Sequence, residues 1–309
     1  NGVSVEATVR NLGTLRLVET PVRLMTTHGP LGVRLTAGWI GLDADPTKLE
    51  LRDADSEMSF EVVAERGWPQ STSMFLIGAN LRQDKSLFPI AISHEHRFQE
   101  GVRGNASLAF NELSEESAAF RAEGKRDRFT LGLFGEPTRR EYFAATLNGL
   151  RYLTRAGASL GKGIKLDLEL GHRLWMRHPE WRLSVYGTST WNDLRQNLPQ
   201  DLAMMLPANA GMGAVLPDRY RELGFTTTLQ KGPIKPLGYT GSAFHYVLGT
   251  GLFWRTPPSG IGYRLEAGIG GRLFGADDLS LSGFFSGSQG GVETEPSMGI
   301  GLRYSLRLR

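Results

Sequence analysis

Apolar and polar positions alternate along most of this chain, and residues 298–309 show the alternation most clearly. Side chains of a β-strand point to its two faces in turn, so this segment predicts a strand with one apolar face and one small or cationic face. Such a strand needs an apolar medium on one side and water or polar groups on the other, as a membrane-crossing strand does. The apolar positions are Met298, Ile300, Leu302, Tyr304, Leu306 and Leu308.

The same alternation recurs along the rest of the chain, and short turn signals such as His28-Gly29-Pro30 separate the alternating segments. A long series of segments with this pattern predicts an all-β fold, a transmembrane antiparallel β-barrel. Seventeen segments qualify, but bacterial single-chain barrels have an even number of strands, so we expect sixteen and regard the first segment as the most doubtful. The segments are 2–11, 14–26, 31–41, 57–66, 71–81, 88–98, 101–111, 117–124, 127–135, 140–156, 163–176, 181–192, 219–231, 241–255, 260–274, 278–287 and 296–309.

Two connections are long: the acidic segment 42–56 and residues 193–218, which we call the lid loop. Within the lid loop, residues 201–206 predict a short helix between two prolines. Long connections in compact domains are usually functional or disordered. The lid loop is therefore either a lid or plug of the barrel or a mobile surface loop, and it faces outward if the last strand ends in the periplasm. The residues expected to act in a lid are Asp201, Met204, Met205, Asn209 and Asp218.

The polar faces of the predicted strands carry many acids and bases. They predict cross-strand ion pairs that stiffen the wall, and also a hydrated channel whose weak, repeated contacts let a polar polymer pass. Both interpretations can hold together. Tryptophans and tyrosines near strand ends, such as Trp39 and Tyr263, are expected to form girdles at the membrane surfaces. The expected lumen-lining residues are Glu61, Glu65, Arg103, Lys165, Asp167, Glu169, Arg182, Arg264, Glu266, Arg272, Arg303 and Arg307.

The composition excludes several other classes of protein. Of the 309 residues 40% are hydrophobic and the net charge is only +3, so the chain is not intrinsically disordered. The 35 Lys and Arg are interleaved with 32 Asp and Glu, which argues against nucleic-acid binding. Cysteine is absent, and no apolar run is long enough for a transmembrane helix. No signal peptide precedes Asn1, so we expect a mature protein or a domain of a longer one.

None of the candidate catalytic and metal-binding motifs has the position or the residue spacing that its chemistry requires. His94 and His96 would point the same way from a strand, but they share the parity of apolar Ile90 and Ile92, which places them on the lipid side. The sequence has no Gly-x-Ser-x-Gly nucleophile elbow, and the glycine-rich segment 157–163 lacks the spacing of a phosphate-binding loop. We therefore expect no enzyme activity, no metal and no cofactor.

The segments 204–219 and 220–225 and the terminal strand resemble a known family. Over essentially its whole length the chain is similar to the C-terminal porin domains of exopolysaccharide-export proteins, above all those of the Pel biofilm polysaccharide system. Porins that export poly-N-acetylglucosamine and cellulose are related. The resemblance implies one barrel domain, residues 1–309, in the outer membrane of a Gram-negative bacterium, preceded by a periplasmic helical-repeat scaffold.

The resemblance also implies partners. The barrel would lie among outer-membrane lipids, pass a partly deacetylated amino-sugar polymer, and dock with a periplasmic-side lipoprotein and a biosynthetic complex. For such a cationic polymer, the acids of the lumen set would offer transient charge contacts, although bases outnumber acids in that set. Many barrel proteins end in an aromatic residue, whereas this chain ends in Arg309.

Three alternatives to an export porin remain open at this stage. A general small-solute porin would differ only in pore width, loops and partners. An outer-membrane barrel enzyme acting on lipid or sugar would need a Ser, His and Asp cluster that shows no recognisable spacing here. A soluble β-sandwich or carbohydrate-binding module conflicts with the long apolar strand faces.

Overall fold

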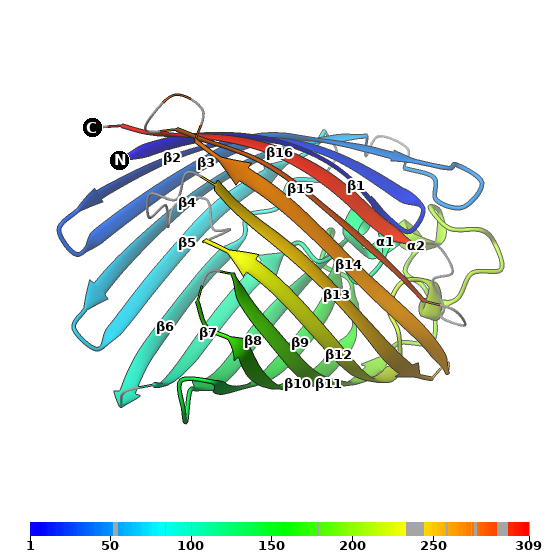
Figure 1. Ribbon diagram of the computed structural model, residues 1–309. Coiled ribbons are helices and arrows are strands. Elements are labelled where there is room, and N and C mark those ends of the chain that lie inside the picture. The colour runs from blue at the N-terminus through cyan, green and yellow to red at the C-terminus, as the bar shows by residue number, and fades with distance from the viewer. Residues whose placement is uncertain are drawn as a thin grey trace.

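Sixteen antiparallel strands form one closed barrel in the computed structural model (Figure 1). Each strand pairs with its neighbours in sequence, and β1 pairs with β16 to close the ring. Closure satisfies the backbone hydrogen bonds that an open sheet edge would leave unpaired in a membrane. The structure describes residues 1–51, 55–83, 85–99, 101–177, 179–232, 244–257, 259–272, 274, 277–288 and 296–308.

In the residues that the structure describes, helical structure is confined to three short elements in connections between strands. The helices are α1 (Ala118–Glu123), α2 (Gln200–Ala203) and the 3-10 turn η1 (Met212–Ala214). Within the described part of the chain, no helix is long and apolar enough to cross a membrane. The strands are β1 (Gly2–Leu12), β2 (Leu15–His28), β3 (Leu31–Ala44), β4 (Ser56–Trp68), β5 (Ser71–Leu81), β6 (Ile90–Gln99), β7 (Val102–Glu112), β8 (Gly124–Gly135), β9 (Glu141–Thr154), β10 (Ser159–Trp175), β11 (Glu180–Leu194), β12 (Arg219–Lys231), β13 (Phe244–Thr256), β14 (Gly260–Gly271), β15 (Asp277–Ser288) and β16 (Ser297–Arg307).

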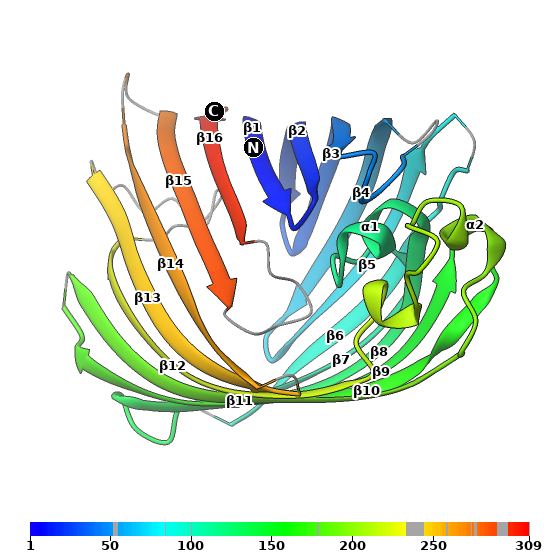
Figure 2. The same ribbon diagram turned by 90° about the vertical axis from the view of Figure 1, so that its right-hand side faces the viewer.

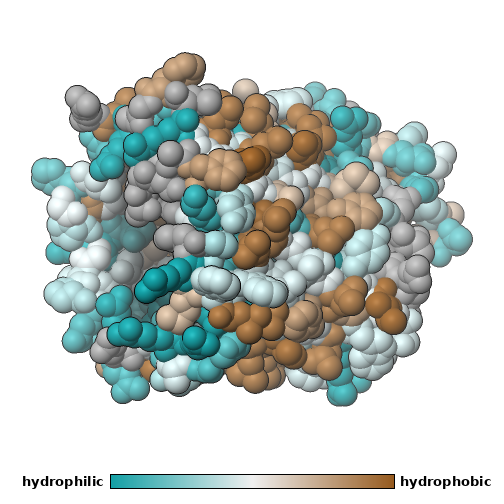
Figure 3. Space-filling view, in the orientation of Figure 1, coloured by the Kyte–Doolittle hydropathy of each residue, from teal (hydrophilic) through white to brown (hydrophobic). Residues whose placement is uncertain are grey.

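The outer wall of the barrel is a belt of exposed apolar side chains, as the alternation predicts. On β16, Ile300 is 56% exposed and Leu302 is 48% exposed. Arg303, on the other face of the strand, is partly buried. The space-filling view shows apolar side chains over the outer wall and hydrophilic ones toward its two ends (Figure 3). An exposed belt of this extent requires an apolar medium around the barrel.

The predicted strand at 117–124 is wrong, whereas the doubted first segment forms β1 in full. Residues 118–123 form α1, and the hydroxyl of Ser117 caps it by accepting a hydrogen bond from the Phe120 N–H at 3.1 Å. Every residue of α1 is buried. A segment surrounded by protein has no lipid face, so it lacks the alternation that identifies the strands. Removing it leaves the even strand number that we expected.

Both chain ends lie at one end of the barrel, and the helices lie at the other. The Leu308 N–H donates to the Asn1 carbonyl at 3.0 Å. Seen from the end that carries the helices, α1 and α2 lie against one side of the ring formed by the strands (Figure 2). They form a hydrophobic core with inward-facing wall residues of β2, β3 and β9, which we call the inner core. Its members are Leu15, Leu17, Leu42, Leu49, Ala118, Ala119, Phe120, Ala122, Leu150, Tyr152, Leu160, Leu202, Met205, Met212, Val215 and Leu216.

Replacing Phe120 by alanine should destabilise the folded barrel by about 3–4 kcal/mol, because its fully buried ring is lost from the inner core. Urea unfolding in lipid vesicles measures this loss. The control is Phe75→Ala, whose ring is 48% exposed on the outer wall. Equal effects of the two substitutions would show that the inner core does not stabilise the barrel.

Candidate functional site

The candidate site is the polar inner wall of the barrel, where a recess of about 440 Å³ opens on the lumen. Three of the sequence-predicted residues, Lys165, Asp167 and Glu169, line it from alternate positions of β10. Arg264 of β14 also lines it. The strand periodicity that sends the leucines of β10 outward sends these charges inward. The structure thus brings together four predicted residues from two strands.

Glu222 of β12 accepts hydrogen bonds from three side chains at this recess, and sequence reasoning missed it. Its carboxylate accepts hydrogen bonds from Arg264 at 2.6 Å and Arg255 at 2.8 Å. The hydroxyl of Tyr186 donates to it at 2.9 Å. The Glu222 side chain is 3% exposed, whereas those of Arg264 and Arg255 are 46% and 36% exposed. The buried carboxylate therefore fixes two guanidinium groups that still face the lumen.

Aromatic rings lie beside these guanidinium groups. Arg255 lies over the ring of Tyr220 at 4.9 Å, and Arg264 lies over Phe253 at 4.8 Å and over Tyr186 at 5.3 Å. Such pairs combine a flat apolar surface with hydrogen-bond donors. A sugar residue presents the same two features, an apolar ring face and a rim of hydroxyls, so this wall is chemically suited to saccharides.

Other polar groups of the recess make close contacts with one another. Asp167 accepts from the Thr188 hydroxyl at 2.7 Å and lies 3.5 Å from the Lys165 ammonium. Glu169 accepts from the Tyr142 hydroxyl at 3.1 Å. The Lys165 and Asp167 side chains are about one-third exposed, so water screens their attraction. They are available for exchange with a passing ligand.

Three further predicted residues form ion pairs elsewhere on the lumen side. Glu61 lies 3.3 Å from Arg34, and Arg103 lies 3.7 Å from Glu95. The Arg103 guanidinium also covers the Phe134 ring at 4.4 Å. Arg182 donates to the Glu180 carboxylate at 2.5 Å. The first two pairs join neighbouring strands and support the interpretation of a wall stiffened across its strands, whereas the pair of Arg182 with Glu180 lies within β11.

The remaining predicted lumen residues lie away from the recess. Glu65, Glu266 and Arg307 are exposed on β4, β14 and β16. Arg303 lies opposite Glu6 in the ladder that closes the barrel and is partly buried. Arg272 is exposed just beyond the end of β14. The predicted set is therefore spread over the lumen and is not a single cluster.

The lid loop packs into the barrel through residues that differ from most of those predicted. Leu202, Val215 and Leu216 are fully buried in the inner core, and Met205 is 7% exposed. Of the predicted lid residues only Met205 joins this core. The predicted helix is present as α2, but it starts one residue earlier than predicted and ends at Ala203, three residues before the predicted end at 206.

The other predicted lid residues lie on the surface of the loop or at its ends. Met204 is 38% exposed, and Asn209 is exposed. The Asp201 carboxylate lies 3.5 Å from the Lys85 ammonium. Asp218 is exposed, but its carbonyl accepts a hydrogen bond from the Asn192 N–H at 2.7 Å. The loop is also joined to the N-terminal end of α1, since the Ser117 hydroxyl donates to the Val215 carbonyl at 2.6 Å.

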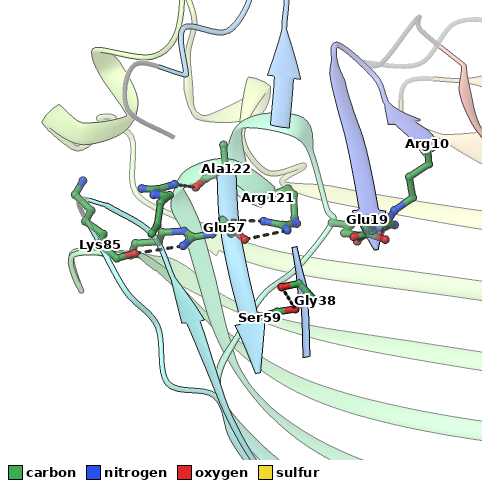
Figure 4. Close-up of polar contacts among 11 residues, drawn as sticks. Arg10, Glu19, Gly38, Glu57, Ser59, Lys85, Arg121 and Ala122 are labelled. Atoms are coloured by element: carbon green, nitrogen blue, oxygen red, sulfur yellow. Dashed lines mark hydrogen bonds and ion pairs between the residues drawn. The ribbon is translucent and has the colours of Figure 1, made fainter. Parts of the chain in front are cut away.

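A buried ionic network centred on Glu57 of β4 lies beside α1 (Figure 4). Its fully buried carboxylate accepts from Arg121 of α1 at 3.2 Å and from Arg155 in the β9–β10 turn. Burial lowers the pKa of the Arg155 guanidinium to about 10, so the group stays charged at neutral pH. The network fastens α1 to two distant parts of the wall.

A second set of ion pairs extends this network toward the lid loop. Arg82 donates to the Glu123 carboxylate at 2.9 Å and to the Ala122 carbonyl at 2.7 Å. The Lys85 ammonium bridges Glu123 at 2.5 Å and Asp201 at 3.5 Å. Burial lowers the pKa of Lys85, but the contact with Glu123 outweighs it, so the net shift is upward. Glu123 thus joins α1 to the β5–β6 connection and, through Lys85, to the lid loop.

Sequence reasoning missed this network for identifiable reasons. Glu57 is four positions before Glu61 on the same predicted strand, so the alternation that assigns Glu61 to the lumen assigns Glu57 to it as well. Arg121 lies in the segment wrongly predicted as a strand, and Arg82 lies just beyond a predicted strand. Arg155 falls inside the predicted segment 140–156, whereas β9 ends at Thr154. Tertiary contacts alone bring these residues together.

The paired histidines lie on the outer wall, as predicted. Their rings stack 6.5 Å apart, and His94 Nδ1 lies 2.8 Å from the Ser73 hydroxyl. Among the residues that the structure describes, no group of three or more His, Cys, Asp or Glu side chains is placed to hold a metal ion. Three other residues of interest in the sequence, the isolated His178, the expected girdle residue Tyr239 and the terminal Arg309, fall outside the described residues.

Comparisons with known proteins identify relatives of this barrel. The family model described as "PelB, C-terminal beta barrel domain" matches residues 1–307. A solved "Bacterial polysaccharide outer membrane secretin" aligns with 100% of this chain and 98% of its own, at a TM-score of 0.69 and 10% identity. OccK3 (OpdO) of Pseudomonas aeruginosa aligns with 99% of this chain and 94% of its own, at a TM-score of 0.50 and 8% identity. These two likenesses concern the fold. The search of curated proteins finds no match.

Replacing Glu57 by glutamine should destabilise the barrel by about 3–5 kcal/mol, because Arg121 and Arg155 would be left buried without their counter-charge. The matched control is Glu61→Gln on the same strand face, where the half-exposed pair with Arg34 is worth at most about 1 kcal/mol. Urea unfolding of both variants in vesicles measures the difference. A loss of less than 1 kcal/mol for Glu57→Gln would contradict the assigned role of the network.

Proposed function

This chain belongs to the family of PelB C-terminal beta barrel domains, and we propose that it is the outer-membrane porin through which an exopolysaccharide leaves the cell. The observation that supports this most is the lumen recess, where Glu222 holds two arginines beside aromatic rings. The solved polysaccharide secretin with the same fold agrees with it. The barrel lies in the outer membrane with its exposed apolar belt in contact with lipid.

The inner wall would conduct the polymer by weak, repeated contacts. Hydroxyl, carboxylate and guanidinium groups of β10, β11, β12 and β14 line the recess and exchange hydrogen bonds with sugar hydroxyls. Partly exposed pairs such as Lys165 with Asp167 cost little to open. Conduction needs sites that bind strongly enough to admit the polymer and weakly enough to release it. In this proposal the lumen performs no chemistry and needs no cofactor.

The family resemblance points to a partly deacetylated amino-sugar polymer, which carries positive charge. Asp167 and Glu169 are the recess acids that such a polymer would meet, since both carboxylates line the recess. Among the residues that the structure describes, neither accepts a hydrogen bond from an arginine as Glu222 does. The predicted lumen acids Glu61, Glu65 and Glu266 would offer further charge contacts along the wall. An ammonium group of the polymer would exchange with the Lys165 ammonium at Asp167.

We further propose that the lid loop and α1 form a plug that narrows the lumen. Its support is the inner core, which fastens both segments to inward-facing wall residues. A periplasmic helical-repeat scaffold, a periplasmic-side lipoprotein and the biosynthetic complex would deliver the polymer at the end where the chain termini lie. Nucleic acid has no place in this function.

In planar bilayers, amino-sugar oligosaccharides should interrupt the single-channel current of the barrel. The double substitution Asp167→Asn and Glu169→Gln should shorten each interruption by about fivefold, the equivalent of 1 kcal/mol at partly exposed charges. The control is Glu141→Gln, an acid paired with His172 at 3.1 Å on the outer wall. Oligosaccharides that never interrupt the current would indicate a general small-solute porin instead.

Deletion of residues 195–215 should increase the single-channel conductance. It removes most of the inner-core residues that the lid loop contributes, and with them the part of the plug that narrows the lumen. Heat-dependent electrophoretic migration checks that the shortened barrel is still folded. A folded deletion variant with unchanged conductance would remove the plug from the proposed mechanism.

A further inference from the structure

A groove of about 660 Å³ lies on the outer wall, near the end of the barrel that carries the lid loop. Its floor is a single register row that crosses five strands, β7 to β11. In this row Leu108 pairs with Phe129, Phe129 with Gly149, Gly149 with Ile164, and Ile164 with Trp191. The four large side chains are 41–53% exposed. The groove is therefore an apolar trough across the strands, separate from the lumen.

The groove is deepest at Gly149, because this residue has no side chain; we call this place the hollow. It lies at the centre of the row, and a Cβ added there would meet nothing within 4 Å. Phe129 and Ile164 rise on its two sides. A chain of methylene groups can therefore lie at this position in contact with large apolar side chains, which are the neighbours that burial of an acyl chain requires.

The next outward-facing row toward the rim of the barrel is charged. Arg151 and Lys162 lie directly opposite each other at its centre, and their side chains are 64% and 78% exposed. Asp127 and Asp193 flank them, each 3.9 Å from its neighbouring cation. A third cation, Arg219, pairs with Trp191 in the ladder and lines the same groove.

Two like charges directly opposite each other on neighbouring strands are destabilising unless an anion lies between them. The flanking acids are at the limit of contact distance, and the side chains of Arg151 and Lys162 are themselves largely exposed, so the donors of these two cations remain accessible. Phosphate groups accept strong charge-assisted hydrogen bonds from such donors. Basic clusters beside an apolar membrane surface are typical binding sites for phosphorylated lipid head groups.

The position in the membrane identifies the leaflet. Transmembrane barrels have short turns on the periplasmic side and longer loops outside. The lid loop and the connection from β3 to β4 lie at the end opposite the chain termini, which is therefore the outer end. The groove and its charged row thus face the outer leaflet, where phosphorylated lipids with several acyl chains are found.

We propose that this groove binds one such lipid, a bisphosphorylated, multiply acylated glycolipid of the lipid A class. Its phosphates lie between Arg151 and Lys162, with Arg219 beside them, and an acyl chain fills the hollow over Gly149. The site is independent of the lumen and of polymer export.

Native mass spectrometry of the purified barrel with added lipid A tests this site. The double variant Arg151→Gln and Lys162→Gln should weaken binding at least about tenfold, because two charge-assisted contacts are lost. Gly149→Leu should weaken it similarly by filling the hollow, although it changes no charge. Dephosphorylated lipid A should bind the native barrel as weakly as lipid A binds the double variant.

Two control variants share the chemistry but lie outside the groove. Arg66→Gln removes an outward arginine that covers the Trp68 ring at the opposite rim. Gly187→Leu adds a side chain to the outer face of β11, where a Cβ has only an ordinary contact. Both should bind lipid A like the native barrel. The proposal would be overturned if the native barrel bound dephosphorylated lipid A or phosphatidylglycerol as tightly as lipid A. It would also be overturned if the groove variants bound lipid A as tightly as the native barrel does, or if millimolar inorganic phosphate alone displaced lipid A.

Discussion

The requirement that every backbone polar group in a bilayer find a partner within the protein governs this structure. The pairing of β1 with β16 meets that requirement by closing the sheet. Closure gives each strand one face toward lipid and one toward the lumen. The apolar alternation, the charged inner wall and the location of every connection at one of two rims all follow from it.

The inner face then has to accommodate charge, and it does so in two physically different ways. Around the recess, partly exposed groups such as Lys165 and Asp167 remain in contact with water and attract each other weakly. Near the rim that carries the helices, Glu57 holds Arg121 and Arg155 where water is excluded. Groups of the first kind suit the passage of a polymer, whereas those of the second kind fix α1 in place. Glu222 combines both, since it is buried but presents exposed guanidinium groups to the lumen.

The strands could be predicted from sequence because lipid contact imposes an apolar residue at every second position. The same rule fails for residues 117–124, which contact protein on all sides and form a helix. Parity also predicts which face a residue occupies, and the structure places Lys165, Asp167 and Glu169 on the face of β10 that lines the recess. Parity does not predict neighbours on other strands: Glu222 and Arg264 are 42 positions apart, and Glu57 and Arg155 are 98 apart.

Passage of the polymer through the lumen is the central claim, and the absence of cysteine allows a direct test. In cells that produce the protein, Tyr186→Cys would place one thiol beside the recess, and Val185→Cys would place one on the outer wall. The measurement is the amount of polysaccharide at the cell surface after labelling with a bulky thiol reagent. The account predicts that labelling at Tyr186→Cys stops export and that treatment of Val185→Cys leaves it unchanged. Undiminished export from cells in which the Tyr186→Cys thiol is fully labelled would contradict it.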